Sequence, residues 1–504
     1  MKLELLDYDI VVLGGGPGGL PAAIAAAREG ARVLLVEKNG YLGGNLTLGL
    51  PLLGFLDKDG NPVIGGIAQE LIEALRARGA CGEHHWCPMH DSVTIYNDEV
   101  FKIVAFEACR KAGVELLLHT QVIDANVENG RIRSVTLFGK GRRMEVTAKV
   151  FLDATGDGDL GYLAGARYEK GQKETGTLQP PTLMCTVDGV DIEKTIAYVE
   201  AHPEQMRLAP TIETYPGFDG RYFRANPDQH VMVGFRKLFL ELKAEGILPV
   251  DRDTMIYIET LTPGRVNLNC TRHLGIDGSD VRDLTRAEIE GHLQNLELID
   301  VLRQYVPGFE HCQLTKIYPF IGIRETRRFH GLCTLTEQDL LSGSIPADTI
   351  GLGSYIIDIH DGGGNGTIVK KVRPYGMPYG MTVSADLTNL MFSGRCASMD
   401  AVALSSCRVM PPLMAMGQGA GVGEANRRCP GPNGRFDWAA IGQVLHEIGY
   451  EDDVVMEPFV RMGGQVRRDV SLWRDLSGGA DDAKLDQDAA ASLRWLRGVM
   501  EGSN

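Results

Sequence analysis

The N-terminal residues alternate between apolar runs and small-residue segments in an order that predicts a β-α-β unit. Residues 10–13 form an apolar run, a glycine-rich turn follows over 14–19, and small residues fill 20–27. A second short segment, Arg32 to Val36, is apolar after its first residue. Short continuous apolar runs bounded by glycine are typical of buried strands, and the segment between these two has the length and composition of a helix. The pattern therefore predicts a strand, a helix and a second strand.

Beyond this unit, apolar residues recur at two different spacings. Helical spacing predicts amphipathic helices over 67–78 and 97–112, and a longer helix over 285–305 that begins at Thr285. Alternating or continuous apolar runs predict strands between them. The predicted strands cover residues 115–119, 121–126, 132–138, 144–148, 150–152, 182–187, 255–261 and 265–270.

The first glycine-rich turn has the spacing of a dinucleotide-binding motif. The run Gly14-Gly15-Gly16-Pro17-Gly18-Gly19 lies between the predicted strand and helix, and Glu37 follows the second strand. Glycines allow a tight turn and a close approach of backbone to pyrophosphate, and the helix N-terminus offers free N–H groups to it. An acid about twenty positions later accepts the ribose hydroxyls. The strand, helix and acid around the glycines indicate a nucleotide site rather than a structural turn.

Two further glycine-rich stretches lack that context. Residues 362–366 precede no helix-forming run, and 417–421 lie inside a helix-like segment. A disulfide-reductase type of flavoenzyme needs a second nucleotide motif and a redox-active CxxC pair, and the sequence contains neither.

The composition is that of a folded, acidic protein. The chain has 504 residues with a net charge of −15, 44% hydrophobic residues and 62 glycines. Its length predicts two or three domains. Nucleic-acid binding requires a basic surface, so we expect no nucleic-acid partner, and an RNA-modifying flavoprotein is disfavoured.

The ten cysteines are scattered and form no CxxC pair, so neither a disulfide framework nor a metal centre is expected. Cys81 and Cys87 flank His84-His85, which leaves a metal site as a weaker alternative. The sequence shows no signal-peptide pattern and no apolar run of about 18 residues. We expect a cytoplasmic protein without a membrane span.

Several segments together resemble the FAD-dependent oxidoreductase family, flavoproteins with a glutathione-reductase-like FAD domain but no NAD(P)H domain. The resemblance covers most of residues 7–425 and is not specific for a substrate. It rests on the opening GGGPGG with Glu37-Lys38, Leu42-Gly43-Gly44, residues 150–159, 322–328, 358–361, 392–396 and 408–411.

The resemblance implies that FAD is the cofactor and that its ring lies near Asn45 and residues 408–412. Glu37 is expected at the adenosine ribose and Val122 near the adenine. Pro411 and Pro412 at a helix start favour negative charge on the reduced ring, although they are equally compatible with a buried helix end. The expected cofactor-binding residues are Gly14, Gly16, Pro17, Gly18, Gly19, Glu37, Lys38, Gly43, Gly44, Asn45, Val122, Thr155, Gly156, Asp157, Gly394, Arg395, Arg408 and Met410.

The expected fold class is α/β, a Rossmann-like FAD-binding domain with an inserted α+β substrate domain and a helical C-terminal tail. The tail is interpreted as a cap or as an arm for oligomers of identical chains. The expected domains are 1–160 and 386–428 for FAD, 161–385 for substrate and 429–504 for the tail.

His360 is the expected proton acceptor. It lies between Asp358 and Asp361, and a carboxylate on one ring nitrogen raises the basicity of the other. His330 and the pair His84-His85 are weaker candidates, and a structural role for His360 stays open.

The dense basic cluster Arg324, Arg327 and Arg328 suggests an anion site. If this stretch is a strand, Arg324 and Arg328 share one face, and Arg324 clamps a substrate carboxylate. An ion-pair network with Glu325 is the alternative. Tyr355, Tyr375 and Tyr379 are expected to line the substrate slot, and plain packing is the alternative for all three.

The sequence therefore predicts an FAD-dependent oxidoreductase. It is expected to transfer hydride between flavin and a small polar metabolite, a hydroxy, sugar-like, amino or carboxylate compound, with a separate electron acceptor. The alternative is a non-catalytic flavoprotein subunit that conducts electrons or acts as a scaffold.

Overall fold

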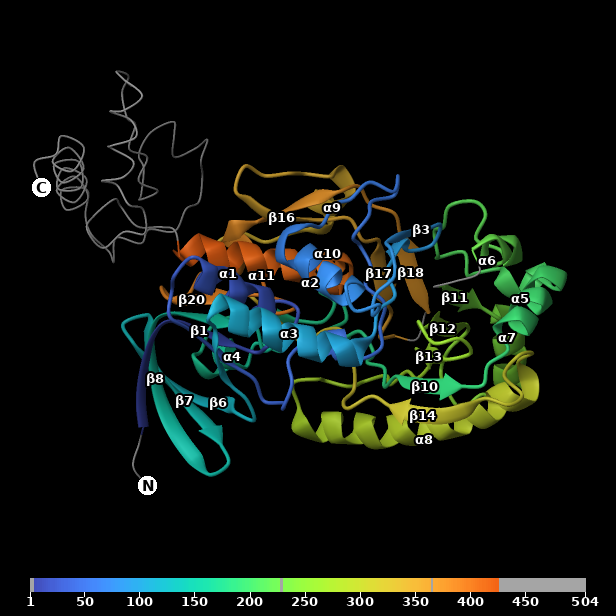
Figure 1. Cartoon of the computed structure of the whole chain (residues 1–504), viewed down its shortest axis with the longest axis horizontal. Helices are drawn as coiled ribbons and strands as arrows, with labels where there is room; N and C mark the ends of the chain where they lie inside the picture. The colour runs from blue at the N-terminus through green and yellow to red at the C-terminus, as the bar shows by residue number, and fades with distance from the viewer. Residues whose placement is uncertain (1–3, 227–229, 364–365, 426–504) are drawn as a thin grey trace, which may run out of the picture.

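The structure, a computed structural model, describes residues 4–226, 230–363 and 366–425, which form two lobes, each built on its own sheet (Figure 1). The expected boundary at 429 and the expected tail lie outside these residues. None of the helices in the described segments combines the length and the apolarity needed to cross a membrane.

The first lobe is built on a seven-stranded sheet whose central strands are parallel. Its order is β5 (Glu115–Leu117), β2 (Val33–Val36), β1 (Glu4–Leu13), β8 (Arg142–Asp153), β7 (Arg131–Gly139) and β6 (Gln121–Glu128), with β20 (Leu390–Phe392) also paired to β8. The predicted β-α-β unit is confirmed, because β1 and β2 are parallel neighbours in the register Ile10 to Val33.

Strand β8 joins the early and late parts of the chain. One side pairs with β1, from Glu4 opposite Met144 to Leu13 opposite Asp153. On the other side, β7 pairs with the first half of β8 and β20 with its last three residues. The predicted strands over 132–138 and 144–148 are confirmed as the antiparallel pair β7 and β8, and residues 150–152 continue β8 along β1.

Helix α1 (Gly19–Arg28) packs on β1 and β2 of the first sheet. Against α1 pack α2 (Gly66–Arg76), α3 (Asp98–Ala112) and α11 (Met410–Ala425). The caps explain the bounds of α3. The Asn97 side chain accepts from the N–H groups of Glu99 and Val100, and Gly113 ends the helix in the left-handed region. The predicted helices over 67–78 and 97–112 are therefore confirmed to within two residues.

The glycines of α11 have a packing role. A Cβ at Gly417 would lie 2.0 Å from the Gly18 carbonyl oxygen, and one at Gly421 would lie 2.3 Å from that of Ala22. These contacts let α11 pack directly on α1. Residues 417–421 lie within a helix, as expected, and form no second nucleotide motif.

The second lobe is an antiparallel sheet covered by one long helix (Figure 1). The sheet order is β11 (Val231–Gly234), β12 (Met255–Glu259), β13 (Val266–Leu268), β10 (Cys185–Asp188) and β14 (Gln313–Ile317). Helix α8 (Val281–Tyr305) packs along it, and α5 (Ile192–Ala201), α6 (Gly220–Ala225) and α7 (Arg236–Ala244) lie at its far end.

Helix α8 begins four residues before the predicted start at Thr285. The Asp280 side chain caps it, because its Oδ1 accepts from the N–H groups of Arg282 and Asp283. Thr285 instead donates to the Val281 carbonyl within the first turn. Aspartate and threonine both favour a helix start, and here the aspartate, Asp280, is the cap rather than Thr285.

Shorter elements connect the lobes and carry part of the site. The hairpin of β17 (Ile357–His360) and β18 (Thr367–Lys370) lies beside the second sheet, and Val369 bridges to Ile212 (Figure 1). The others are β3 (His85–Cys87), β4 (Asp91–Val93), β9 (Tyr168–Lys170), β15 (Arg327–Phe329), β16 (Thr349–Gly353), β19 (Tyr375–Pro378), α4 (Asp159–Leu163), α9 (Glu337–Ser342) and α10 (Ala401–Cys407).

Candidate functional site

A cleft of about 260 Å³ opens where the parallel strands of the first sheet end. Gly14 and Gly16 follow β1, Glu37 follows β2, residues 154–157 follow β8 and residues 394–395 follow β20. Ligands of open α/β sheets bind outside the carboxyl ends of the strands. The position of this cleft is therefore that of a nucleotide site.

Three glycines of the turn are required by close packing. A Cβ at Gly14, whose φ is +99°, would lie 2.3 Å from the Ala154 carbonyl oxygen. A Cβ at Gly19 would lie 1.9 Å from the Gly14 carbonyl oxygen. A Cβ at Gly18 would lie 2.7 Å from Ser393 Oγ. These contacts bring the turn, the end of β8 and the end of β20 together.

Gly16 and Gly394 face open space instead. A Cβ at Gly16 would meet nothing nearer than the Gly44 Cα at 3.9 Å, and one at Gly394 would meet nothing within 4 Å. Both residues line the cleft. A side chain at either position would fill the cleft, so the bare backbone there fits a diphosphate that approaches closely.

Glu37 is buried and fixes the loop beside it. Its Oε2 accepts from the Gly15 N–H at 2.8 Å, and its Oε1 accepts from the Asn39 N–H at 2.8 Å. The carboxylate lines the cleft and can accept sugar hydroxyls with its remaining lone pairs. The acid therefore has the position that the motif predicts.

Asp153 organises the loop after β8, a role that the candidate residues chosen from the sequence did not include. Its Oδ1 accepts from the Thr155 N–H at 3.0 Å and from the Thr155 hydroxyl at 2.7 Å. Its Oδ2 accepts from the Gly161 N–H at 2.8 Å. The signal was an acid at the end of an apolar strand, directly before Ala154-Thr155-Gly156.

A positively charged side chain faces the cleft from the end of β20. Arg395 Nη2 pairs with Asp157 Oδ1 at 3.0 Å, whereas its buried Nη1 has no hydrogen-bond partner within the described segments. A buried guanidinium nitrogen without an acceptor is costly, and a phosphate oxygen would satisfy it. The donor set thus fits FAD.

The structure brings most of the predicted cofactor residues into this cleft, but not all of them. Gly19 and Gly43 lie beneath it, where the Gly43 N–H donates to the Gly15 carbonyl. Val122 lies in β6 outside the lining. The predicted residues that line the cleft are Gly14, Gly16, Pro17, Gly18, Glu37, Lys38, Gly44, Asn45, Thr155, Gly156, Asp157, Gly394, Arg395, Arg408 and Met410.

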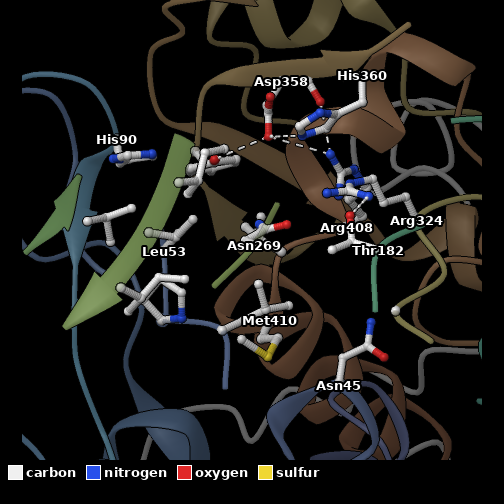
Figure 2. A pocket seen from close by; sticks show the side chains of 18 of the residues that line it. Asn45, Leu53, His90, Thr182, Asn269, Arg324, Asp358, His360, Arg408 and Met410 are labelled. Atoms are coloured by element: carbon white, nitrogen blue, oxygen red, sulfur yellow. Dashed lines mark hydrogen bonds and ion pairs between the residues drawn. The ribbon is translucent and has the colours of Figure 1, made fainter. Parts of the chain in front are cut away.

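A second cavity of about 140 Å³ lies between the two lobes. The cavity and the nucleotide cleft meet at the residues that line both, which are Asn45, Phe320, Ile323, Arg395, Arg408 and Met410. In Figure 2, Asn45 and Met410 lie at one end, and Asp358, His360, Arg324 and Arg408 gather at another. A compound in this cavity would lie next to the end of the bound dinucleotide.

His360 and Asp358 form the polar centre of this cavity. His360 Nε2 lies 3.4 Å from Asp358 Oδ2, and both side chains project from β17 (Figure 2). Burial and the charge of Arg324 lower the pKa of His360 to about 3, against the opposing effect of Asp358. Burial would raise the pKa of Asp358, but His360 and the charges of Arg408 and Arg324 outweigh it and lower that pKa. At neutral pH the pair is a neutral imidazole beside a carboxylate.

Two guanidinium groups lie beside this pair (Figure 2). Arg408 Nη2 donates to the Asp358 carbonyl at 2.9 Å and lies 3.5 Å from its Oδ2. Arg324 Nη1 donates to Thr182 Oγ1 at 2.9 Å and to the Pro180 carbonyl, and its Nε and Nη2 make no hydrogen bond within the described residues. Burial and the charges of Arg408 and Arg252 lower the pKa of Arg324 well below its usual value.

The condition that residues 324–328 form a strand is met only from Arg327 onward, where β15 begins. Arg324 precedes the strand and turns into the cavity, whereas Arg328 forms a buried pair with Glu325. Arg327 donates to the Asp157 carbonyl at 2.9 Å. The predicted ion-pair network therefore exists for Arg328, while Arg324 remains separate from it.

Of the remaining tyrosine and histidine candidates, only Tyr355 lines the cavity. Its hydroxyl lies 3.5 Å from Asp358 Oδ2. Tyr375 and Tyr379 are fully buried packing residues. Neither His330 nor His84 lines the cavity. His330 lies 3.7 Å from Glu169, and His84 stacks on Phe55.

No cluster of three or more metal-ligating side chains occurs in the part of the chain that the structure describes. Cys81 and Cys87 belong to that part and carry free thiols. His90, which the sequence analysis did not single out, lines the cavity opposite the His360 pair (Figure 2). It follows a short strand in an irregular loop, and no spacing pattern marked it.

Comparisons with curated proteins give matches of very different extent. Thiamine thiazole synthase of Aeropyrum pernix is 32% identical over 206 residues, which cover 38% of this chain and 68% of that protein. D-psicose 3-epimerase of Ruminiclostridium cellulolyticum is 53% identical over 79 residues, 16% of this chain. The chain spans only 27% of the length of that epimerase.

Among solved structures, a geranylgeranyl bacteriochlorophyll reductase-like protein from Thermoplasma acidophilum is similar to this chain. The TM-score is 0.40 at 16% identity, over 84% of this chain and 77% of that one. The sequence profile described as FAD dependent oxidoreductase matches residues 9–425. The chain therefore belongs to the family of FAD-dependent oxidoreductases.

Proposed function

We propose that this enzyme oxidises a small-molecule substrate held between the two lobes, with His360 accepting a proton as the substrate gives up hydride. FAD, when bound in the cleft, supplies the acceptor for that hydride. The observation that carries the proposal is the His360–Asp358 pair, 3.4 Å apart, in a cavity that meets the nucleotide cleft. A separate electron acceptor then completes the redox cycle.

Asp358 and Tyr355 act as positioning residues for His360. The Asp358 carboxylate faces the Nε2 side of the imidazole, and the Tyr355 hydroxyl lies 3.5 Å from the same Oδ2. A carboxylate at one ring nitrogen fixes the tautomer and orientation of the ring and supports the imidazolium that forms. Thr367 Oγ1 lies 3.5 Å from His360 Nδ1.

Arg324 couples substrate binding to the basicity of His360. Its positive charge is one of the causes that lower the pKa of His360 to about 3. A substrate anion on the free side of this guanidinium would offset that charge, so the imidazole becomes a stronger base once the substrate is bound. The polar group of the substrate, a carboxylate in this proposal, therefore lies at the Arg324 end of the cavity.

The test is anaerobic photometry of the flavin absorption band in the purified holoenzyme. Hydroxy acids, amino acids and sugars are added in turn, and one class is expected to bleach the band. The active compound is then deuterated at the reacting carbon, and slower bleaching is expected because that C–H bond breaks. Bleaching without an isotope effect, or no bleaching by any compound, would contradict the proposal.

FAD retention is expected to depend on Glu37. Replacing Glu37 with alanine removes the carboxylate that faces the cleft, and a hydrogen bond to a charged group contributes about 1.5–3 kcal/mol, so the Kd for FAD should rise about 10- to 100-fold. Fluorescence titration of the apoprotein measures this change. Glu128→Ala, at an exposed acid of the same lobe, is the matched control. Equal FAD affinity in Glu37→Ala and the control would rule out the ribose role.

A further inference from the structure

The cavity between the lobes has an apolar wall opposite its charged end. Strands β11 and β12 contribute the side chains of Val231, Val233, Ile256 and Ile258. In Figure 2 Asp358, His360, Arg324 and Arg408 gather at one side, Leu53 and His90 lie at another, and Asn269 lies between them. Aliphatic side chains of other segments, among them Leu48, Leu50 and Met184, also line the cavity.

Among Asp358, His360, Arg324 and Arg408, which form the charged end, the guanidinium charges outnumber the carboxylate charge by one. Arg408 pairs with Asp358, and His360 is neutral at physiological pH. Arg324 has no carboxylate partner within the described residues, and only its Nη1 is hydrogen-bonded. Its side chain is buried, with 9% exposed. A buried charge without a counter-ion is strongly unfavourable, so an anion that enters the cavity would gain the pairing energy.

The position of Arg324 assigns that anion to the substrate rather than to the cofactor. Arg395 and Arg408 line both the nucleotide cleft and the cavity, whereas Arg324 lines only the cavity. Arg395 and Arg408 are therefore placed to serve the cofactor. The Nε and Nη2 nitrogens of Arg324 can form the two parallel hydrogen bonds that a carboxylate accepts.

We infer that the substrate joins a carboxylate to a compact apolar body, with the carboxylate on Arg324 and the body against β11 and β12. This inference rests on the proposed function and replaces its broad class of polar metabolites with an amphiphilic acid. The hydroxyls of a sugar or polyol that face the aliphatic side chains of β11 and β12 would lack partners there, each at a cost of about 1–3 kcal/mol. The cavity volume, about 140 Å³, resembles that of an engineered cavity that holds benzene. The apolar body is therefore the size of one ring or a short alkyl chain.

The inference is tested by equilibrium binding of straight-chain carboxylates, from acetate to octanoate, to the FAD-loaded enzyme. Titration calorimetry gives the Kd, and no turnover is needed. We expect about fourfold tighter binding for each added methylene until the cavity is full. The matching primary amides should bind at least about tenfold more weakly, because they cannot neutralise Arg324.

Two variants separate the charge from the wall. Arg324→Gln should abolish the preference for carboxylate over amide and keep the gain per methylene. Val233→Thr, of nearly equal volume, should reduce that gain and keep the preference. Arg265→Gln, at a half-exposed arginine paired with Asp188 in the second sheet, is the control and should bind as the wild type does. Thermal melting of each variant checks that it is folded.

The possible outcomes distinguish this inference from the proposed function. Affinities that do not change with chain length, or an unchanged carboxylate preference in Arg324→Gln, would overturn the inference. If only sugars or polyols bleach the flavin, the inference fails and the hydride transfer stands. If carboxylates bind with both expected trends and no compound bleaches the flavin, the inference stands and the proposed function fails.

Discussion

Replacing Gly16 with valine will abolish FAD binding and leave the fold intact. A Cβ at this position meets nothing nearer than 3.9 Å in the protein, so the folded chain has room for it. The same space belongs to the cleft, and the extra carbons would occupy the place of the pyrophosphate beside the first turn of α1. Loss of that contact is expected to leave the purified protein colourless.

The flavin absorption of the purified protein and its uptake of added FAD measure this effect. Circular dichroism should give the same spectrum and a melting temperature like that of the wild-type apoprotein. Gly65→Val is the matched control, because Gly65 also has open space around its ideal Cβ and no positive φ, but it lies at the start of α2 outside the cleft. A yellow Gly16→Val protein with normal FAD content would show that the pyrophosphate lies elsewhere.

Replacing His360 with asparagine will slow flavin reduction by about 100-fold or more, the contribution usual for a general base. FAD content should not change, because His360 lines the cavity and not the cleft. Stopped-flow photometry under anaerobic conditions, with the substrate identified by bleaching, measures the rate. His330→Asn is the matched control, since His330 lies outside the cavity. A rate equal to that of the control would exclude His360 as the proton acceptor.

The pH profile distinguishes a base from a packing residue. His360 is faced by Asp358 on its own strand and by Arg324, Arg252 and Arg408 from neighbouring segments. Because burial and Arg324 lower its pKa to about 3, the wild-type rate should not fall on account of His360 between about pH 5 and 8. Arg324→Gln removes one cause of that lowering, so the loss of rate should begin at a higher pH. If the rate of Arg324→Gln begins to fall at the same pH as that of the wild type, the coupling between Arg324 and His360 is contradicted.

The nucleotide half of the site could be predicted because its chemistry is local. A strand, a glycine turn, a helix and an acid lie within 37 residues of the chain start, and each signal has a direct physical cause. The structure places Gly14, Gly16, Gly18 and Glu37 around one cleft. The resemblance extended this to Gly394 and Arg395, which no periodicity near the N-terminus marks.

The substrate half depends on contacts between distant segments. His360 was chosen for its flanking acids, but Asp361 does not line the cavity and Asp358 does. A strand assumed over residues 324–328 put Arg324 and Arg328 on one face, whereas only the last part of that segment is extended. His90 and the aliphatic wall of β11 and β12 enter the site through tertiary packing alone. Spacing along the chain carries no information about such contacts.

The pairing of β20 with β8 has a consequence for how the chain is made. Ser393 at the end of β20 donates to the Gly18 carbonyl 375 positions earlier, and α11 then packs on α1. During synthesis on the ribosome, the N-terminal β-α-β segment is therefore complete long before β20 and α11, which pack against it, have been made. Native contacts of such long sequence separation slow folding. A truncation before residue 390 would release a nascent chain whose glycine turn lacks its contacts with Ser393 and α11.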